Sequence, residues 1–357
     1  MPAKVINYAL IGFGGIAENR VAKEGFACDR SRFAPLKHAK LVGATDMNPA
    51  RQAAAEALGL KWYADMNAIF ADPSIDAVYV ATNNRSHAEI AIAALNAGKH
   101  VIVEKPAATD ANDVKKMMAA AKKNNLSLTV DHMMVNNAWN ILAKKKVAAG
   151  AIGKVNDSCF HMEFAYGYDP AEAATWRCSK IEEMGGPIGD VASHCFYVAE
   201  FVFGMKIKKV AAVYLPKLMN IKAEDGAYIR YFFEDGTQGS VKCAFSELRG
   251  GLSGTLTNLG FEIYGDKAAL RSYGTMFQLS GHKGEPVKMR LELDNCGKVR
   301  TLEPTKIQNI YQTLIEGHAK SVQTGKHLDA ADALHNLELC AAAHKSAQNG
   351  GKLISVD

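Results

Sequence analysis

The sequence predicts an α/β protein with an N-terminal Rossmann-type parallel-sheet domain and a C-terminal α+β domain with an open, mostly antiparallel sheet. Residues 1–132 alternate short apolar runs with helical patterns, as in a parallel sheet covered by helices on both faces. Residues 133–357 instead contain stretches in which polar and apolar residues alternate, which is typical of a sheet with one covered face. A chain of 357 residues is long enough for two such domains.

The composition is that of an ordinary globular protein and argues against two classes of partner. The chain has 48% hydrophobic and 22% charged residues and a mild formal net charge of +5. Its lysines are spread over helical stretches and form no basic stripe with aromatic residues, so no nucleic-acid partner is expected. No window reaches the roughly 18 consecutive apolar residues of a membrane span, so no membrane partner is expected either.

The cysteines and histidines show no pattern of a metal site. Seven cysteines are scattered along the chain, and their number is odd, which is typical of reduced thiols in the cytoplasm. Four histidines lack a partner pattern and are interpreted as structural: His161, His318, His327 and His335. We therefore expect a cytoplasmic protein without a metal ion.

The expected elements of the first domain are short strands separated by helices. Strands are expected at residues 5–11, 39–45, 77–81, 100–103 and 126–130. Helices are expected at residues 49–58, 86–96 and 110–124. Gly59 and Gly98 are typical glycine ends of such helices.

The expected elements of the second domain are alternating strands followed by two helices. Strands are expected at residues 154–166, 208–215, 227–234, 238–245, 261–264 and 288–293. Helices are expected over residues 187–203, 307–323 and 329–347. Gly185 and Gly186 suit the loop before the first of these helices, and Pro187 suits its first turn.

A glycine-rich turn follows the first expected strand. Residues 12–17, GFGGIA, fit the pattern G-x-G-x-x-G/A of dinucleotide-binding domains. The first glycine permits a tight turn, the second lets the backbone approach a pyrophosphate, and the free N–H groups of the helix start favour an anion. We therefore expect the turn to bind a dinucleotide through Gly12, Phe13, Gly14, Gly15 and Ile16.

Asp46 ends the second expected strand, where a carboxylate can bind the ribose hydroxyls. The separation along the sequence between Gly12 and Asp46 is longer than in the usual pattern, where it is about 20 residues. Neither of the two residues after Asp46 is a cation that would bind a 2′-phosphate, so NAD is expected and NADP is less favoured. Arg51 on the next helix can approach a 2′-phosphate, so NADP stays an alternative cofactor. Alternatively, Asp46 is only a turn residue.

The segment after the third strand carries a more specific pattern. Residues 78–106, VYVATNNRSHAEIAIAALNAGKHVIVEKP, closely resemble the signature of the Gfo/Idh/MocA oxidoreductases, the family of glucose–fructose oxidoreductase and inositol dehydrogenase. The family usually has Pro where this chain has Asn83. The resemblance implies cofactor contacts by Thr82, Asn84, His87, Glu104 and Lys105. Asn84 and His87 can alternatively cap the following helix, for which Ser86 is the better N-cap.

Further segments extend the resemblance into the second domain. Residues 176–194, WRCSKIEEMGGPIGDVASH, are similar to the family's Trp-Arg pair, glycine pair and D-x-x-x-H helix. Residues 149–154 and 261–274 are similar to its domain junction and to a strand–turn–strand segment. The resemblance implies a substrate pocket lined by Trp176, Arg177, Asp190 and His194. Alternatively, the Trp-Arg pair is a buried tryptophan beside a salt bridge.

The chain departs from the family after the last strand of the first domain. Relatives often carry an Arg followed by Pro there, whereas residues 131–140 are DHMMVNNAWN. The substrate group that this Arg would contact is therefore left to other residues. His132 and Asn136 are the candidate polar replacements.

The expected catalytic residues are Lys105, Asp190 and His194. Lys105 lies at the carboxyl edge of the expected sheet, and Pro106 restricts it to extended conformations and makes the bond between them a candidate cis peptide. Lys105 would stabilise the substrate oxygen, and His194 would take the hydroxyl proton. Asp190, four residues before His194 on one helix face, would orient the substrate or tune its cationic partners. Alternatively, these are a solvated lysine and a surface Asp–His pair.

The expected function is NAD-dependent hydride transfer between nicotinamide and a secondary alcohol of a sugar, polyol or cyclitol. Two alternatives stay open: an NAD-dependent glycosidase on the same fold, and a non-catalytic NAD(P)-binding sensor or regulator. One face of the open sheet has no helix packed on it and would expose apolar side chains. A homodimer or homotetramer through that face is therefore expected, as in relatives. Substrate binding and oligomerisation are thus assigned to residues 133–357.

Overall fold

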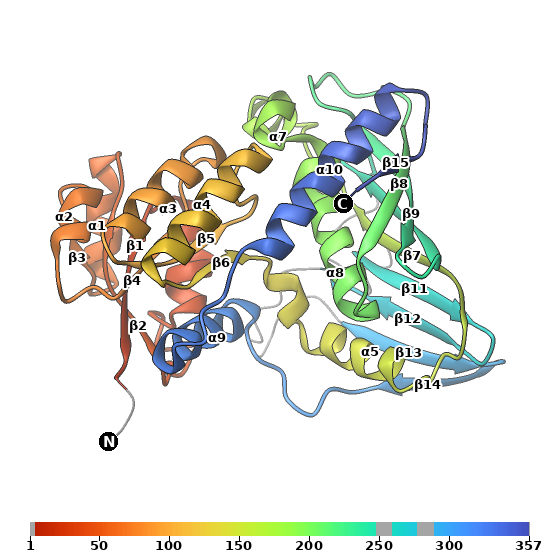
Figure 1. Cartoon of the computed structure of the whole chain (residues 1–357), viewed down its shortest axis with the longest axis horizontal. Coiled ribbons are helices and arrows are strands. Elements are labelled where there is room, and N and C mark those ends of the chain that lie inside the picture. The colour runs from red at the N-terminus through yellow and green to blue at the C-terminus, as the bar shows by residue number, and fades with distance from the viewer. Residues whose placement is uncertain (1–3, 248–258, 277–288, 357) are drawn as a thin grey trace. The chain divides into compact units, whose positions relative to one another are not determined.

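The computed structural model describes residues 4–247, 259–276 and 289–356. These residues divide into two compact units, each with its own sheet, and Figure 1 labels their helices and strands. The first unit comprises residues 4–133 and 308–334. The second comprises residues 134–247, 259–276, 289–307 and 335–356.

The first unit is built on sheet A, a six-stranded sheet in which every strand pair is parallel. The strand order is β3–β2–β1–β4–β5–β6. The strands are β1 (Ile6–Ile11), β2 (Ala39–Thr45), β3 (Lys61–Trp62), β4 (Ala77–Val80), β5 (His100–Glu104) and β6 (Leu128–Asp131). The order reverses between β1 and β4, where such sheets open a crevice at the carboxyl ends of their strands. The predicted Rossmann-type domain is confirmed.

The helices of the first unit follow the strands along the chain. They are η1 (Ala17–Gly25, a π-helix), η2 (Pro49–Arg51), α1 (Gln52–Ala57), α2 (Met66–Ala71), η3 (Asn84–Ser86), α3 (His87–Asn96) and α4 (Ala111–Asn124). Asp110 caps α4, because its side chain accepts the Asn112 N–H. Ser86 was the predicted N-cap before α3. The structure corrects this, since the Asn83 side chain accepts the Ser86 N–H and Ser86 makes no side-chain cap bond.

A helix from late in the sequence completes the first unit. α9 (Ile310–Thr324) packs against η1, β1, β2 and β6. Its His318 lies with Nδ1 2.7 Å from the Tyr8 hydroxyl, and both side chains are fully buried. The range 133–357, assigned above to the second domain, therefore contains a helix whose contacts belong to the first unit.

The second unit is built on sheet B, a nine-stranded sheet with the order β14–β13–β12–β11–β7–β10–β9–β8–β15. Its strands are β7 (Val155–Glu163), β8 (Ile207–Tyr214), β9 (Gly226–Phe233), β10 (Gln238–Ala244), β11 (Leu259–Gly265), β12 (Ala269–Tyr273), β13 (Arg290–Asn295), β14 (Lys298–Leu302) and β15 (Ile354–Ser355). β7 and β10 pair in parallel, and the other described pairs are antiparallel. The predicted mostly antiparallel sheet is confirmed. Residue 288 of the expected strand 288–293 lies outside the described residues.

One face of sheet B is covered by helices, and the side chains of its strands alternate accordingly. The described helices of this unit are α5 (Ala138–Ala148), α6 (Pro170–Ala173), α7 (Trp176–Ser179), η5 (Ile181–Glu183), η6 (Ile188–Ala192), α8 (Ser193–Phe203) and, from residue 335 on, α10 (Ala331–Gln348). The turn η4 (Met133–Asn136) joins the two units along the chain. α8 packs on β7 and α5, and η6 packs on β10. Phe160 and Met162 of β7 are buried, whereas Cys159 and His161, which alternate with them, are half-buried on the opposite face.

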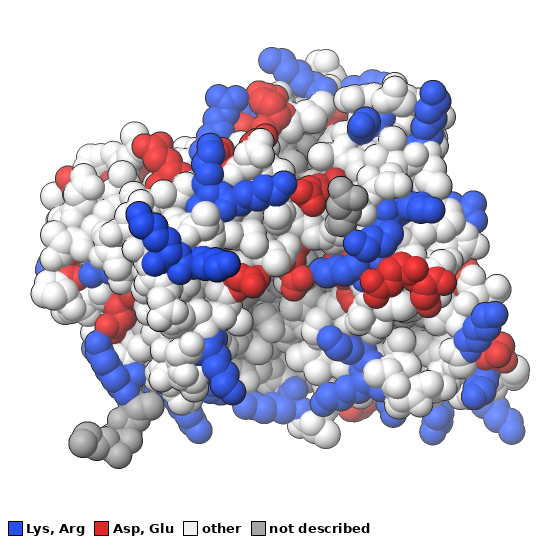
Figure 2. Space-filling model, in the orientation of Figure 1, with Lys and Arg blue, Asp and Glu red and all other residues white. Residues whose placement is uncertain are grey.

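The surface carries both signs of charge, and no described helix is a membrane span. On the face drawn in Figure 2, Lys and Arg side chains are interspersed with Asp and Glu. Within the described residues, no helix combines the length and apolar character needed to cross a membrane.

Candidate active site

The glycine-rich turn lies at the carboxyl end of β1, in the middle of sheet A. Gly12 has φ +89°, and a Cβ there would lie 2.6 Å from the Ala81 carbonyl oxygen, so only glycine fits. Gly14 and Gly15 are exposed, and a Cβ on either would meet nothing within 4 Å. The next residue, Ile16, is 43% exposed. The turn thus offers exposed backbone with open space above it.

Asp46 fixes this turn from the end of β2. Its Oδ2 accepts the Phe13 N–H at 2.6 Å, and its Oδ1 accepts the Asn48 N–H at 2.8 Å. Asp46 therefore acts as the turn residue considered above and also orders the glycine turn. The carboxylate remains half-buried, and the Phe13 side chain is fully buried, so Phe13 faces the site only through its backbone.

Arg51 is held on the far side of the same turn. Its Nε donates to the Phe13 carbonyl at 2.7 Å, and its guanidinium forms an ion pair with Glu18. Lys23 also pairs with Glu18, and the hydrogen bonds from these two cations contribute to lowering the pKa of the Glu18 carboxyl. Arg51 is thus engaged by protein groups at the place where NADP would need a cation.

The segment after β4 supports the neighbouring strand end. His87 is fully buried, with Nδ1 2.8 Å from the Pro106 carbonyl and Nε2 3.3 Å from the Thr82 carbonyl. Burial lowers the pKa of His87, so the neutral ring donates one N–H, to the nearer Pro106 carbonyl. Thr82 is half-buried and accepts the Ser86 hydroxyl at 2.8 Å, and Asn84 is buried. His87 therefore links the end of β4 to the segment that carries Lys105.

Glu104 and Asp131 are paired at the ends of β5 and β6, and Tyr79 of β4 bridges them. The Tyr79 hydroxyl lies 2.9 Å from Glu104 Oε1 and also bonds to Asp131 Oδ2. A hydroxyl has one proton to donate, so one of the two carboxyls must itself carry a proton. Burial and then the charge of Glu104 raise the pKa of Asp131 well above its usual range, against the opposing effects of Tyr79 and Lys105, which favours Asp131 as the proton carrier. Sequence reasoning missed Tyr79 and Asp131.

Lys105 follows Glu104 at this same strand end. It is half-buried, and its peptide bond to Pro106 is cis. Its positive charge acts to lower the pKa of the buried Asp131 carboxyl. His132 is next to Asp131 in the chain, and it is 5% exposed.

In the second unit, Asp190 and Arg177 are brought together. Arg177 Nε donates to Asp190 Oδ2 at 3.2 Å, and Asp190 is 6% exposed. The Asp190 charge raises the pKa of Arg177, and the guanidinium stacks 4.7 Å from the Trp176 ring centre. Of the sequence-based alternative, a buried tryptophan beside a salt bridge, the structure has the salt bridge, whereas Trp176 is half-buried.

The helix that carries Asp190 and His194 begins differently from the single helix expected over 187–203. Residues 188–192 form the π-helix η6, and the α-helix α8 begins at Ser193. The Glu224 carboxylate accepts the Ile188 N–H at 2.9 Å at the start of η6. Glu224 is buried, which raises its pKa to about 7. His194 is 4% exposed, and Asn336 of α10 holds the start of α8 by donating to the Ser193 carbonyl at 2.8 Å.

The residues of the first unit fit a dinucleotide. The exposed glycines leave room for a pyrophosphate close to the backbone, as the open space over Gly14 and Gly15 shows. η1 starts directly after them and directs free N–H groups to that space. Asp46, at the end of the adjacent strand, is positioned for the ribose of such a ligand.

Comparison with known proteins agrees with this arrangement. Residues 6–132 match the oxidoreductase family with an NAD-binding Rossmann fold, and residues 141–271 match the GFO/IDH/MocA C-terminal domain. The chain is 30% identical over 288 residues to the 1,5-anhydro-D-fructose reductase of Ensifer adhaerens, which covers 78% of this chain and 79% of that protein. It is 35% identical over 155 residues to the levoglucosan dehydrogenase of Pseudarthrobacter phenanthrenivorans, which covers 43% of this chain and 40% of that protein.

Solved structures share the fold over nearly the whole chain. The aldose-aldose oxidoreductase from Caulobacter crescentus, complexed with glycerol, has a TM-score of 0.83 at 22% identity and covers 99% of this chain and 100% of that one. A levoglucosan dehydrogenase in complex with NADH and levoglucosan has a TM-score of 0.82 at 24% identity, with the same coverage. With an NAD-binding Rossmann domain followed by the family's own C-terminal domain, this chain belongs to the Gfo/Idh/MocA family of oxidoreductases.

Proposed function

We propose that the protein transfers a hydride between the nicotinamide of NAD and a secondary alcohol of a sugar, polyol or cyclitol. The observation that carries the proposal is the glycine turn, which Asp46 holds open at the carboxyl edge of sheet A, the same edge at which Lys105 follows β5. Relatives named as an anhydro-fructose reductase, a levoglucosan dehydrogenase and scyllo-inositol dehydrogenases support this class of substrate.

Lys105 and His194 are assigned the two roles at the reacting carbon. When bound, the nicotinamide supplies a hydride acceptor for oxidation and a hydride donor for reduction. The Lys105 ammonium donates a hydrogen bond to the substrate oxygen and stabilises negative charge there. His194 takes the hydroxyl proton while the C–H bond breaks and the C=O bond forms, and it returns the proton in the reverse direction.

Substrate binding is assigned to four residues: Asp190, Arg177, Trp176 and His132. Asp190 offers a carboxylate to sugar hydroxyls, and its ion pair with Arg177 fixes the direction of both groups. The Trp176 ring, stacked on Arg177, offers an apolar face to a sugar ring. His132, directly after Asp131 in the first unit, takes the place of the Arg that relatives carry.

The cofactor preference follows from Asp46 and Arg51. A 2′-phosphate would bring negative charge to the half-buried Asp46 carboxylate. Arg51, the cation nearest in sequence, already pairs with Glu18 and bonds to the Phe13 carbonyl. NAD is therefore favoured over NADP.

The proposal is tested with purified protein, NAD and a panel of monosaccharides, anhydro sugars, polyols and inositols. NADH formation, followed by absorbance, is expected with at least one member of the panel. Calorimetry with NAD in parallel shows whether the cofactor binds. Bound NAD without hydride transfer to or from any member, in either direction, would contradict the proposed reaction.

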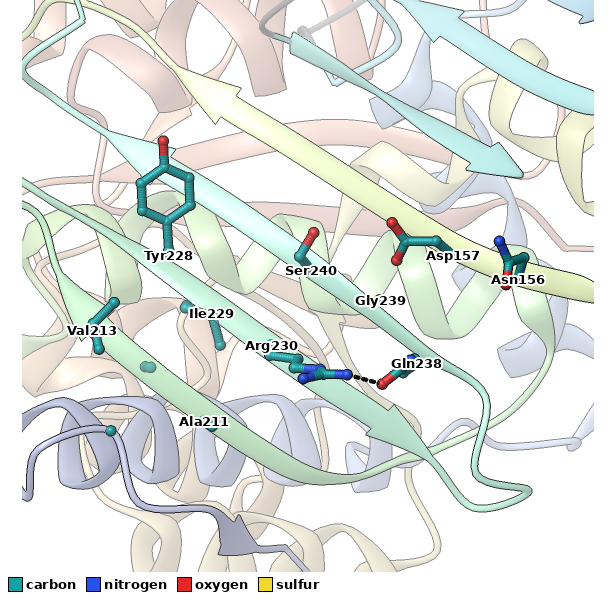
Figure 3. Close-up of a pocket in the computed structure, with 12 residues that line it drawn as sticks. Asn156, Asp157, Ala211, Val213, Tyr228, Ile229, Arg230, Gln238, Gly239 and Ser240 are labelled. Carbon is teal, nitrogen blue, oxygen red and sulfur yellow. Dashed lines mark hydrogen bonds between the residues drawn. The ribbon is translucent and has the colours of Figure 1, made fainter. Parts of the chain in front are cut away.

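We also propose a homodimer or homotetramer through the uncovered face of sheet B. This face exposes apolar side chains whose exposed fractions are 52% for Val213, 50% for Tyr228, 39% for Tyr264 and 51% for Val299. It also has a hollow of about 600 Å³ over β7, β8, β9 and β10, with Tyr228, Arg230 and Asp157 on its lining (Figure 3). Light scattering of the native chain should give a multimer, and Tyr228→Glu should lower the mass.

A cytoplasmic location is proposed from the cysteines. All seven lie within the described residues and are free thiols, which is typical of a reducing compartment. Cell fractionation with an antibody to the native chain tests this. Recovery of the protein outside the cytoplasm would contradict it.

A further inference from the structure

A cysteine, a histidine and a glutamate converge on the uncovered face of sheet B. Cys159 and His161 are two residues apart on β7 and therefore share a face. Glu262 lies directly opposite Cys159 on β11. One ligand atom of each residue, a sulfur, a ring nitrogen and a carboxylate oxygen, lies within 4.8 Å of the other two. None of the three has a role in the reaction proposed above.

We propose that Cys159, His161 and Glu262 form a binding site for one zinc ion. Ligands at the usual zinc distances lie about 3.5 Å from one another in a tetrahedral site. His161 Nε2 and Glu262 Oε2 are 3.0 Å apart, so an ion fits between them after small side-chain movements. The mixture of sulfur, nitrogen and oxygen ligands suits zinc, whereas magnesium and calcium prefer oxygen alone.

The surroundings of His161 hold its ring for this purpose. Glu163 Oε1 lies 3.0 Å from His161 Nδ1. This contact directs the other ring nitrogen, Nε2, toward Glu262. A carboxylate on the second nitrogen is the usual support of a zinc-bound histidine. Glu163 is itself 5% exposed, and Lys242 lies 3.5 Å from it. The residue opposite His161 on β11 is Gly260.

A purely electrostatic cluster is the competing explanation of these contacts. Burial opposes a charge on His161, but hydrogen bonds with Cys159, Glu163 and Glu262 outweigh it and raise the pKa to about 12. A cluster held only by charge and hydrogen bonds, in which Cys159 takes part, needs no metal, so the electrostatic explanation predicts no stoichiometric metal uptake by the native chain or by Cys159→Ser. The zinc site, in contrast, loses one of its three protein ligands with Cys159.

The proposed site has three protein ligands and therefore one open position. In the single chain the His161 and Glu262 side chains are 22% and 26% exposed, so the fourth position is left for a water molecule or for a group of a second copy packed on this face. The ion would join β7 to β11 across the sheet, in addition to their backbone hydrogen bonds. Its binding depends on neither NAD nor a sugar, so its test is independent of the proposed reaction.

The test uses the full-length protein after treatment with a chelator, titrated with zinc in a calorimeter and with cobalt in a spectrophotometer. One equivalent of metal per chain is expected, and the cobalt form should show a thiolate-to-metal absorption band. Cys159→Ser should abolish that band, and His161→Gln should weaken zinc binding by more than about tenfold. Glu163→Gln should weaken it by about 10- to 100-fold through the loss of ring support.

Cys296→Ser is the matched control, because Cys296 is an exposed cysteine of the same unit outside the cluster. It should leave the metal stoichiometry and the absorption band unchanged. Circular dichroism and thermal unfolding show whether each variant is folded, and Glu262→Gln gives a second folded ligand variant at a half-exposed position. Absence of a stoichiometric metal, absence of the thiolate band, or equal binding by Cys159→Ser and the control would overturn the proposal.

Discussion

The two sheets of this protein present their polar groups in different places. Sheet A is parallel and covered on both faces, so its polar groups stand at the carboxyl ends of strands, as Asp46, Glu104 and Asp131 do. Sheet B has an uncovered face, so polar groups such as Cys159 and His161 stand along the strands themselves. A strand end is marked in the sequence by the end of an apolar run, whereas a group on a face is defined by its cross-strand neighbours. The comparison separates the functional groups that sequence can locate from those that only strand pairing can.

The largest expected effect is at a strand end of sheet A. Lys105→Ala should lower kcat by about 100- to 10,000-fold, because the substrate oxygen loses its positively charged hydrogen-bond donor. Steady-state kinetics with NAD and the best substrate measures this. Lys115→Ala, at a surface position of α4, is the control and should keep the activity. Full activity of the Lys105 variant would remove this residue from the reaction.

The next effect concerns stability in the second unit. The pKa of Glu224 is about 7 in the folded protein, above its ordinary value of 4.5, so the folded state keeps a proton that the unfolded state has lost. The free energy of unfolding should therefore fall as pH rises from about 4 to 7, by about 3 kcal/mol, and then level off. Glu224→Gln should remove this fall, and the exposed Glu234→Gln should retain it. Urea unfolding across pH is the measurement, and identical pH profiles for both variants would refute the assignment.

Substitutions at two glycines of the same turn should affect different properties: stability at Gly12 and NAD binding at Gly14. Gly12→Ala places a Cβ 2.6 Å from the Ala81 carbonyl at φ +89°, so it should cost about 2 kcal/mol of unfolding free energy or more. Gly14→Ala meets nothing within 4 Å and should change stability by less than about 0.5 kcal/mol. Its added methyl should still weaken NAD binding by about tenfold or more, because the pyrophosphate needs that space. Unchanged NAD affinity in Gly14→Ala would place the cofactor elsewhere.

The bridged carboxyls of sheet A give a smaller stability effect. Tyr79→Phe should cost about 2 kcal/mol, because it removes the hydroxyl that the buried Asp131 and the half-buried Glu104 share. Asp131→Asn should cost less, since the protonated Asp131 is already neutral and an amide can donate to Tyr79 in its place. Chemical unfolding at neutral pH compares the two. A larger loss for Asp131→Asn would show that Asp131 is charged.

Asp46 gives the smallest of these effects. Asp46→Asn keeps an acceptor for the Phe13 N–H but removes the charge that opposes a 2′-phosphate. The ratio of kcat/KM for NAD over NADP should fall by about tenfold, which corresponds to about 1.4 kcal/mol. Asp65→Asn, a helix N-cap elsewhere in the same unit, is the control and should leave this ratio unchanged. An unchanged ratio in Asp46→Asn would assign the preference to another residue.

Sequence reasoning located the candidate residues that stand directly beside an expected strand. The glycine turn and the acid after β2 were located from their places beside apolar runs, and the lysine after β5 from its place together with the family signature. The helix that begins at Ser193 was expected, but its π-helical first part was not, because π-helices have no local sequence signal. The bridge between Tyr79 and Asp131 was missed because it depends on β4, β5 and β6 being neighbours. Polar residues in apolar strands, such as Tyr79 within AVYV, were the available signal.

The second sheet and the returning helix were harder for the same reason. His161 was interpreted as structural because its partners are not evident from the sequence. Glu163 lies on β7 and Glu262 on β11, and no local sequence signal shows that these strands pair. α9 was assigned to the second domain from its position in the chain, although it packs on β1, β2 and β6. Both cases concern contacts between residues far apart in sequence, which periodicity does not reveal.

The central claim is that Lys105 and His194 act on one substrate hydroxyl. A crystal structure of the protein with NADH and a polyol or sugar substrate tests it most directly. The account predicts that Lys105 Nζ and a ring nitrogen of His194 both lie about 3 Å from the hydroxyl whose carbon faces the nicotinamide. A complex in which either group contacts a different part of the substrate, or none of it, would contradict the proposed mechanism.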